Sequence, residues 1–153
     1  MKKKVTIILV FVVMILGLVG CGANKNQFQV GEKSNIAIPE KGVSLTIKEG
    51  TLTKTGAILV LKNENDFAVQ YEKISYGIEI KKDGEWYRTD VQLFFADVAY
   101  DLKAKETIEL DTKWEEGYGK LAKGEYRIVK NIYHLTNDGT YEQFRVAAEF
   151  NIK

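Results

Sequence analysis

The sequence predicts an all-β fold: an antiparallel sandwich of two sheets with about seven strands, preceded by a short apolar N-terminal segment. Three observations support this fold class. Apolar and polar residues alternate in several segments after residue 42, as they do in strands with one buried face. Turn sequences such as Asp83-Gly84 separate these segments. The last segment, residues 143–152, alternates without a break. Short strands with turns between them are typical of a two-sheet sandwich.

The composition excludes several classes of protein and site. A chain of 153 residues has room for one domain plus a processed segment. With 28% charged and 45% hydrophobic residues, it is neither a disordered chain nor a multi-span membrane protein. A formal net charge of +1 argues against a nucleic-acid partner. One Cys and one His exclude an intrachain disulfide and a four-ligand Cys/His zinc site. We expect no cofactor and no metal.

The N-terminus has the pattern of an export signal. Lys2, Lys3 and Lys4 precede an apolar run over residues 5–19, which is shorter than the roughly 20 residues that a membrane-spanning helix needs. The run ends in Leu18-Val19-Gly20-Cys21, which resembles the bacterial lipobox. The resemblance implies that residues 1–20 form a lipoprotein signal peptide and that the sulfur of Cys21 receives diacylglycerol. The alternatives are a buried N-terminal helix with an inert thiol and an uncleaved signal anchor.

Lipidation at Cys21 predicts a membrane-anchored protein on the extracytoplasmic side. One acyl chain binds a membrane only marginally, whereas two or three bind it stably. Removal of three lysines changes the formal charge from +1 to +1 − 3 = −2. Residues 21–41 are expected to be the lipidated N-terminus and a polar spacer, in which Phe28, Val30, Ile36 and Ile38 allow part of the segment to dock. Residues 42–153 are expected to form the sandwich.

The strands begin at residue 43. Residues 43–47 alternate, and residues 57–61 form a continuous apolar run that suits a central strand. A turn cluster of polar residues follows at 63–66.

A hairpin is predicted around Asp83-Gly84, with strands over residues 76–82 and 85–89. A two-residue loop sets the register. It places Lys82 opposite Glu85, Lys81 opposite Trp86, Ile80 opposite Tyr87, and Glu79 opposite Arg88. Each pair is favourable by charge, by cation–π contact or by shared apolar surface.

Three further strands are predicted in the second half of the chain. The first contains Ile108, Leu110, Thr112 and Trp114, and the second covers residues 125–133. The third follows a turn at residues 137–139 and buries alternate residues from Phe144 to Ile152. Residues 91–102 fit either a strand or a short helical turn.

The segment from Leu121 to Ile128 contains the pattern Leu-x-x-Gly-x-Tyr, formed by Leu121, Gly124 and Tyr126, which looks like a tyrosine corner. Together with residues 83–87 and 147–152, it resembles a bacterial immunoglobulin-like domain family over roughly residues 42–152. The resemblance implies an immunoglobulin-like sandwich at the cell surface and carries no chemistry. The sequence Ala104-Lys105 departs from the Pro-Gly that such domains commonly have at this turn, so we expect a looser turn there.

No catalytic constellation emerges from the sequence. The single histidine, His134, ends a predicted strand, where a rim position is the simplest interpretation. The serines lie in no nucleophile-elbow pattern, and Glu115 and Glu116 are adjacent, which on a strand would direct them to opposite faces. We therefore predict no enzymatic activity.

Aromatic side chains are the candidate contacts for a protein or glycan ligand, namely Trp86, Tyr87, Trp114 and Tyr118. The main functional hypothesis is a non-catalytic domain that binds an envelope protein, a cell-wall polymer or an extracellular ligand. The alternative is an accessory subunit or inhibitor of an exported enzyme or transporter. A third hypothesis is a small hydrolase, since sandwich folds also host enzymes.

Overall fold

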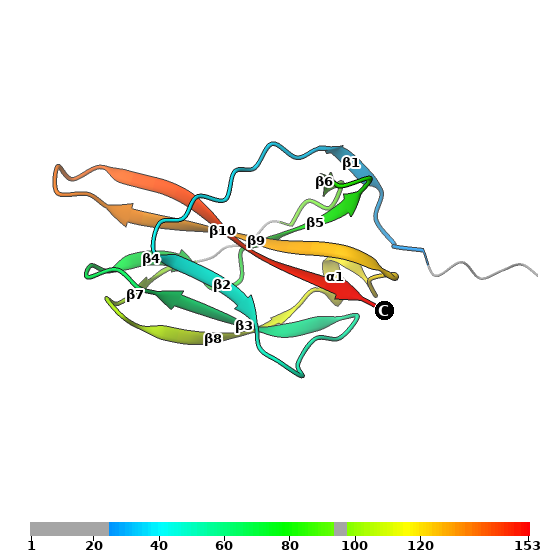
Figure 1. Ribbon diagram of the computed structural model, residues 1–153, viewed down its shortest axis with the longest axis horizontal. Helices are drawn as coiled ribbons and strands as arrows, with labels where there is room; N and C mark the ends of the chain where they lie inside the picture. The colour runs from blue at the N-terminus through cyan, green and yellow to red at the C-terminus, as the bar shows by residue number, and fades with distance from the viewer. Residues whose placement is uncertain (1–24, 94–97) are drawn as a thin grey trace, which may run out of the picture.

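A computed structural model describes residues 25–93 and 98–153 of the chain (Figure 1). The predicted signal peptide, the lipobox residues Leu18, Val19 and Gly20, and the lipidation site Cys21 lie outside the described residues. None of the helices in the described part is long and apolar enough to cross a membrane.

The described residues form ten strands in two antiparallel sheets. The seven-stranded sheet has the order β1-β6-β5-β9-β4-β7, with β10 paired to β9, and the three-stranded sheet has the order β2-β3-β8. The strands are β1 (Val30–Lys33), β2 (Val43–Ile47), β3 (Gly56–Asn63), β4 (Val69–Glu72), β5 (Gly77–Lys82), β6 (Glu85–Thr89), β7 (Ala99–Leu102), β8 (Thr107–Lys113), β9 (Gly124–Leu135) and β10 (Tyr141–Ile152). One short helix, α1 (Glu115–Tyr118), comes after β8.

The prediction of an all-β, two-sheet antiparallel sandwich is confirmed, and the predicted number of about seven strands is too low. The strands that the sequence did not reveal are β1, β4 and β7, with four residues each. Such short segments carry too few residues for a clear alternation, and β7 buries only Leu102. In the region left open, residues 99–102 are a strand and residues 94–97 lie outside the described part.

The predicted hairpin register is confirmed at all four pairs. Asp83 and Gly84 have φ angles of 50° and 82°, and two positive values are what a type I′ turn requires. The Lys81 ammonium lies 5.3 Å from the centre of the Trp86 ring, as expected for the cation–π pair.

The ion pairs of this hairpin are different from those that the register suggested. The Glu79 carboxylate pairs with Arg127 of β9 rather than with Arg88, and Glu85 pairs with Lys33 of β1. Neighbouring strands therefore provide the charged partners that the register placed within the hairpin.

The core lies between the two sheets and contains the inward-facing residues of both. Strand β9 buries Tyr126, Ile128 and Ile132 completely, and β3 does the same with Leu59 and Leu61. An aromatic stack crosses the core, because the ring of Phe150 lies 5.5 Å from Trp114 and 5.7 Å from Tyr126.

The Tyr126 hydroxyl makes the backward hydrogen bond that defines a tyrosine corner. It donates to the backbone carbonyl of Ala122 over 2.9 Å, and its ring is fully buried. Leu121 is also fully buried, and Gly124 lies directly against the Tyr126 ring. The side chain of Asn26 completes the site: its amide donates to the Tyr126 hydroxyl over 2.9 Å, and its carbonyl accepts from the N–H of Ala122.

The segment assigned to a polar spacer is attached to the domain from Asn26 onward. Phe28 is buried and packs edge-on against Tyr118, with ring centres 5.9 Å apart. Strand β1 then pairs with β6. Part of the segment therefore docks on the domain, as we expected from its apolar residues Phe28 and Val30. Figure 1 shows the chain crossing over the seven-stranded sheet from β1 to the start of β2.

We predict that Tyr126→Phe lowers the free energy of unfolding by about 1–3 kcal/mol, because the buried polar groups of Ala122 and Asn26 lose their common partner. Urea unfolding of both proteins measures the difference. The matched control is Tyr141→Phe, since Tyr141 is 59% exposed and should change stability by less than about 0.5 kcal/mol. Equal midpoints for wild type and Tyr126→Phe would contradict a structural role for this hydroxyl.

Candidate functional site

The two ends of the sandwich differ in what they present. The chain enters the described part at Lys25 and finishes at Lys153, and both lie at one end, which we call the entry end (Figure 1). The opposite end, called the hairpin end, consists of the loops at residues 64–68, 103–106 and 136–140.

A buried asparagine holds two of these loops together. Asn63 is completely buried, and its amide donates to the carbonyls of Phe67, at 2.8 Å, and Lys103, at 3.0 Å. Its side-chain oxygen accepts from the N–H of Asn65. Lys105 has a φ of 61°, and its N–H donates to the carbonyl of Asn65. The turn that we expected to be loose is therefore fastened to the neighbouring loop.

At the hairpin end, the exposed side chains of Phe67, Leu135 and Tyr141 and the half-buried ring of His134 form a group that we call the hairpin-end patch. Phe67 is 44% exposed and stacks on His134, with ring centres 4.1 Å apart and planes 19° apart. Leu135 and Tyr141 are 53% and 59% exposed and stand opposite each other on β9 and β10, on the other face of this hairpin from His134. Exposed apolar side chains grouped at one end of a soluble domain are typical of an interaction surface.

Two hollows flank the stacked rings of Phe67 and His134, and both rings line each hollow. One has a volume of about 650 Å³ and also contains Gln70 and Asp101, which hydrogen-bond each other at 3.0 Å. The other has a volume of about 500 Å³ and extends to Glu142. Polar groups beside an aromatic surface can orient a ligand that the rings contact.

The charges around the hairpin-end patch are mostly neutralised in pairs. Lys41 forms an ion pair with Glu142, and Lys105 forms one with Asp66 at 2.9 Å. The hydrogen bond and charge of Lys41 lower the pKa of Glu142, with a smaller contribution from His134. The surface therefore offers a partner apolar contacts that lie beside two ion pairs.

His134 forms no hydrogen bond with a hydroxyl or carboxylate among the described residues, and the described part holds no group of His, Cys, Asp and Glu side chains that suits a metal ion. The hydroxyl of Thr136, which lines the 650 Å³ hollow together with His134, donates to the carbonyl of Thr140.

Two of the four predicted surface aromatics are core residues. Trp114 is completely buried, and its ring N–H donates to the carbonyl of Lys54 over 2.9 Å. Tyr118 is 2% exposed, and its hydroxyl accepts from the N–H of Ile78. Their prediction as surface contacts was wrong, because the turn into α1 directs both rings between the sheets.

The other two predicted surface aromatics, Trp86 and Tyr87, are half-buried on opposite faces of β6. Tyr87 packs against the core, while Trp86 lies under the guanidinium of Arg127, 4.8 Å from its ring centre. Neither belongs to the hairpin-end patch.

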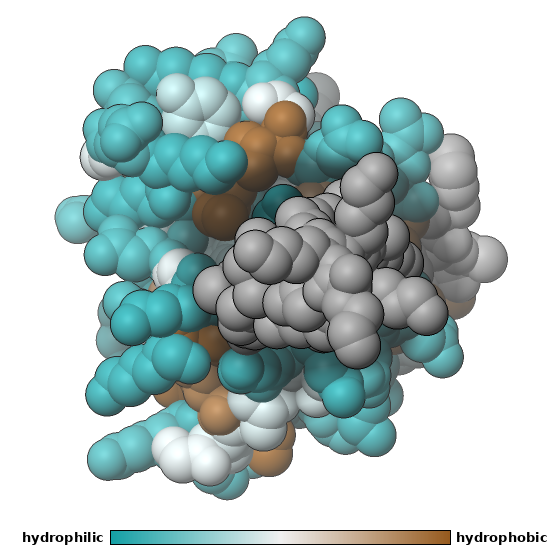
Figure 2. All heavy atoms as spheres, turned by 90° about the vertical axis from the view of Figure 1, so that its right-hand side faces the viewer, coloured by the Kyte–Doolittle hydropathy of each residue, from teal (hydrophilic) through white to brown (hydrophobic). Residues whose placement is uncertain are grey.

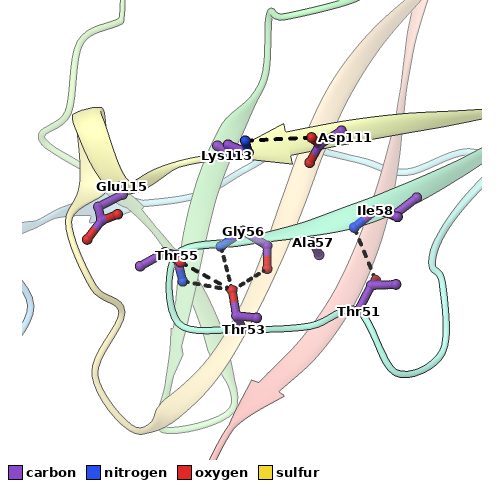
Figure 3. Close-up of a pocket in the computed structure, with 9 residues that line it drawn as sticks. All are labelled: Thr51, Thr53, Thr55, Gly56, Ala57, Ile58, Asp111, Lys113 and Glu115. Carbon is purple, nitrogen blue, oxygen red and sulfur yellow. Dashed lines mark hydrogen bonds and ion pairs between the residues drawn. The ribbon is translucent and has the colours of Figure 1, made fainter.

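The entry end has a hollow of about 480 Å³ lined by three threonines, Thr51, Thr53 and Thr55 (Figure 3). Their hydroxyls are occupied by the turn itself. Thr53 donates to the carbonyl of Gly56 and accepts its N–H, and Thr51 accepts from the N–H of Ile58. These bonds hold the β2–β3 turn in shape, so the hollow is a product of the turn. The coloured residues that face the viewer at this end are mostly hydrophilic (Figure 2).

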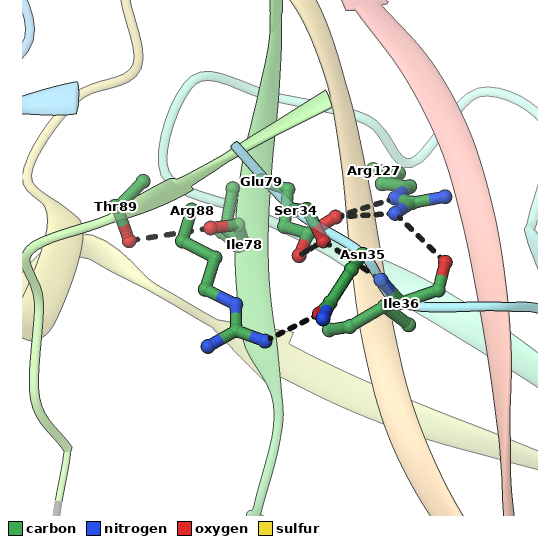
Figure 4. Close-up of polar contacts among 8 residues, drawn as sticks. All are labelled: Ser34, Asn35, Ile36, Ile78, Glu79, Arg88, Thr89 and Arg127. Carbon is green, nitrogen blue, oxygen red and sulfur yellow. Dashed lines mark hydrogen bonds and ion pairs between the residues drawn. The ribbon is translucent and has the colours of Figure 1, made fainter. Parts of the chain in front are cut away.

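A buried ion pair lies under the segment that crosses the seven-stranded sheet (Figure 4). Glu79 and Arg127 are 2.6 Å apart, with side chains that are 4% and 8% exposed. The hydroxyl of Ser34 donates to Glu79 over 2.6 Å, and Arg127 donates to the carbonyl of Ile36. The ion pair therefore holds the crossing segment against the sheet.

The sequence interpretation missed the residues that build the hairpin end. Asn63 was assigned to a turn cluster, and Phe67 was assigned no role. Alternation within single strands does not reveal a contact between residues 67 and 134. A turn asparagine directly after a strand, followed by a lone aromatic residue, was the available signal.

Comparison with known proteins agrees with this architecture. A family model described as a bacterial Ig-like domain matches residues 39–151, a range that contains strands β2 to β9 and nearly all of β10. No match appears among the curated proteins. Strand β1 and Asn26, which fasten the N-terminal segment, precede the matched range.

We predict that the protein loses stability above pH 10. Burial raises the pKa of Tyr76 from 10.0 to about 12, and burial also raises the pKa of Tyr118, whose ring lies 6.2 Å away. Between pH 10 and about 12, the unfolded chain releases the Tyr76 proton while the folded chain keeps it, so the free energy of unfolding falls as pH rises. Urea midpoints measured across this range should decrease, and Tyr76→Phe should decrease less steeply. Parallel slopes for the two proteins would contradict the assignment.

Proposed function

The chain belongs to the bacterial Ig-like domain family, and on this basis we propose that it is a lipid-anchored protein on the extracytoplasmic face of the membrane. Its proposed role is to bind an envelope protein, a cell-wall polymer or an extracellular ligand, without catalysis. The family assignment suggests a non-catalytic domain of the surface type. The lipid anchor and the binding surface are proposals that go beyond the family assignment.

The anchor is supported by the sequence Leu18-Val19-Gly20-Cys21 behind a basic and apolar leader. The only cysteine of the chain stands directly after the apolar run, where a lipobox requires it. Two or three acyl chains at this position supply enough apolar contact to hold a protein stably on a membrane.

The short connection between the anchor and the domain supports a fixed presentation. Asn26 is already bonded to Tyr126. From Cys21 to Asn26 there are 26 − 21 = 5 residue steps, which span at most about 18 Å. The entry end would therefore stay near the membrane, and the hairpin end would point away from it.

The observation that carries the proposed binding role is the Phe67–His134 stack, in which Phe67 is exposed, at the same end as the exposed Leu135 and Tyr141. It lies at the end of the domain opposite the entry end (Figure 1). The Asn63 amide holds the backbone of Phe67 in place, which lowers the conformational freedom that this residue would lose when a partner binds. The neutralised charges beside the rings favour a partner that is recognised by apolar and polar contacts.

We predict that Cys21 carries the fatty acyl chains. Cells grown with labelled palmitate should yield a labelled wild-type protein whose intact mass lacks residues 1–20. Cys21→Ala should contain no label, because no thiol remains to be acylated. The matched control Gly22→Ala should be labelled as well as wild type. Label retained in Cys21→Ala, or absent from the wild type, would overturn the anchor.

We predict that a photo-crosslinking residue placed at Leu135 forms a discrete adduct on intact cells, whereas the same residue at Lys54, which is exposed at the entry end, does not. Phe67→Ala should reduce the Leu135 adduct about tenfold, the loss expected when an aromatic anchor is removed from an interface. Mass spectrometry of the adduct distinguishes a protein from a glycan. Equal adducts at positions 135 and 54 would show that the hairpin end has no specific partner.

A further inference from the structure

All three arginines of the chain lie on one face of the protein, the face of the seven-stranded sheet that points away from the core. They are Arg88, Arg127 and Arg145, among 22 basic residues that are otherwise lysines. Strand pairing places them there: Arg88 and Arg127 both stand opposite Glu79, and Arg145 stands opposite Asn131. The neighbouring residues along β5, β9 and β10, such as Ile78, Ile128 and Val146, face the core.

Only one of the three arginines is neutralised. Arg127 forms the buried ion pair with Glu79 and covers Trp86. The Arg88 guanidinium donates one hydrogen bond, to the side-chain oxygen of Asn35 at 3.1 Å, and Figure 4 shows it turned away from Arg127 on the other side of Glu79. The half-buried Arg145 has no hydrogen-bond or ion-pair partner within the described part of the chain.

Arg88 and Arg145 line the same hollow, which has a volume of about 310 Å³. Asn131, which stands opposite Arg145 on β9, lies in its wall. Gly77 also lines it, and a Cβ atom built on Gly77 would meet nothing within 4 Å, so the space above this residue is open. The hollow is large enough for a small polyatomic anion and one attached group.

Three acidic side chains near the hollow, Glu79, Asp90 and Glu72, have other partners among the described residues. Glu79 is used by Arg127 and Ser34. Asp90 accepts the backbone N–H of Gln29, and Glu72 lies beside Tyr133, whose pKa is raised by burial and then by this carboxylate. No acidic side chain of the described residues forms an ion pair with Arg88 or Arg145. Guanidinium groups are suited to forked hydrogen bonding of oxyanions.

From this arrangement we infer that the hollow between Arg88 and Arg145 is a binding site for a phosphate group. A carboxylate has two oxygens, which one guanidinium satisfies in a bidentate pair. A phosphate group has enough oxygens to accept from two guanidinium groups and from Asn131 at once. The site is separate from the hairpin-end patch and does not depend on the proposed anchor or partner.

The test uses the full chain in detergent micelles and follows thermal unfolding with added inorganic phosphate, acetate or a glycerol phosphate oligomer, all at one ionic strength. Phosphate should raise the unfolding temperature of the wild type in a saturable way. Arg145→Gln removes the charge, and Gly77→Val fills the hollow while leaving both arginines. Each should weaken phosphate binding at least about tenfold, because a charge-assisted contact is lost or blocked. The control Lys54→Gln makes the same charge change at the exposed entry end and should bind as the wild type does.

The outcomes separate the possibilities. Weaker binding in both variants with normal binding in Lys54→Gln supports the site, and tighter binding of the oligomer than of free phosphate assigns the group to a polymer. Equal stabilisation of all variants would indicate a general salt effect and overturn the proposal, as would acetate acting as strongly as phosphate. Urea midpoints without ligand report whether each variant folds. If Gly77→Val does not fold, Arg145→Gln provides the test.

Discussion

The structure depends on the burial of the side chains that β9 directs between the two sheets. This strand pairs with β10 along its whole length on one side and with β5 and β4 on the other, so it joins most of the large sheet. Its inward residues Tyr126, Ile128 and Ile132 are completely buried, and the period of two that buries them places Arg127 and Asn131 on the outer face. One alternation thus produces both the core and the polar outer surface.

The tyrosine corner extends this constraint to the N-terminal segment. Because Asn26 shares its side chain between the Tyr126 hydroxyl and the Ala122 N–H, the chain is fastened to the core before β1 begins. The Glu79–Arg127 pair fastens the same segment again near Ile36. A buried ion pair is expensive to desolvate, and here further hydrogen bonds satisfy both partners, which is the condition under which such a pair is tolerated. The two attachments therefore link the orientation of the domain closely to its N-terminal segment.

The two surfaces considered for binding differ in chemistry, and that difference arises from the fold. The hairpin end collects apolar rings where the β9–β10 hairpin passes beyond the edge of the small sheet, with charges paired around them. The outer face of the large sheet collects arginines over a small open hollow. A lysine-rich surface attracts anions without orienting them, whereas arginine presents a planar fork, so the use of arginine on this face alone is physically distinctive.

The sequence by itself determined what depends on neighbours along the chain. The Asp83-Gly84 turn specified the register of β5 and β6, alternation specified which residues of β10 are buried, and the all-β class resulted from both. Local pattern could not decide that Trp114 and Tyr118 are core residues, that Glu79 prefers Arg127 to Arg88, or that Phe67 stacks on His134. Only the tertiary structure decided these, because each depends on which distant strand occupies the adjacent place in a sheet. The sequence around an aromatic or charged residue does not show which distant residue it will contact. Phe67, for example, stacks on His134, 67 positions along the chain (134 − 67), and whether such a side chain is buried depends on that partner.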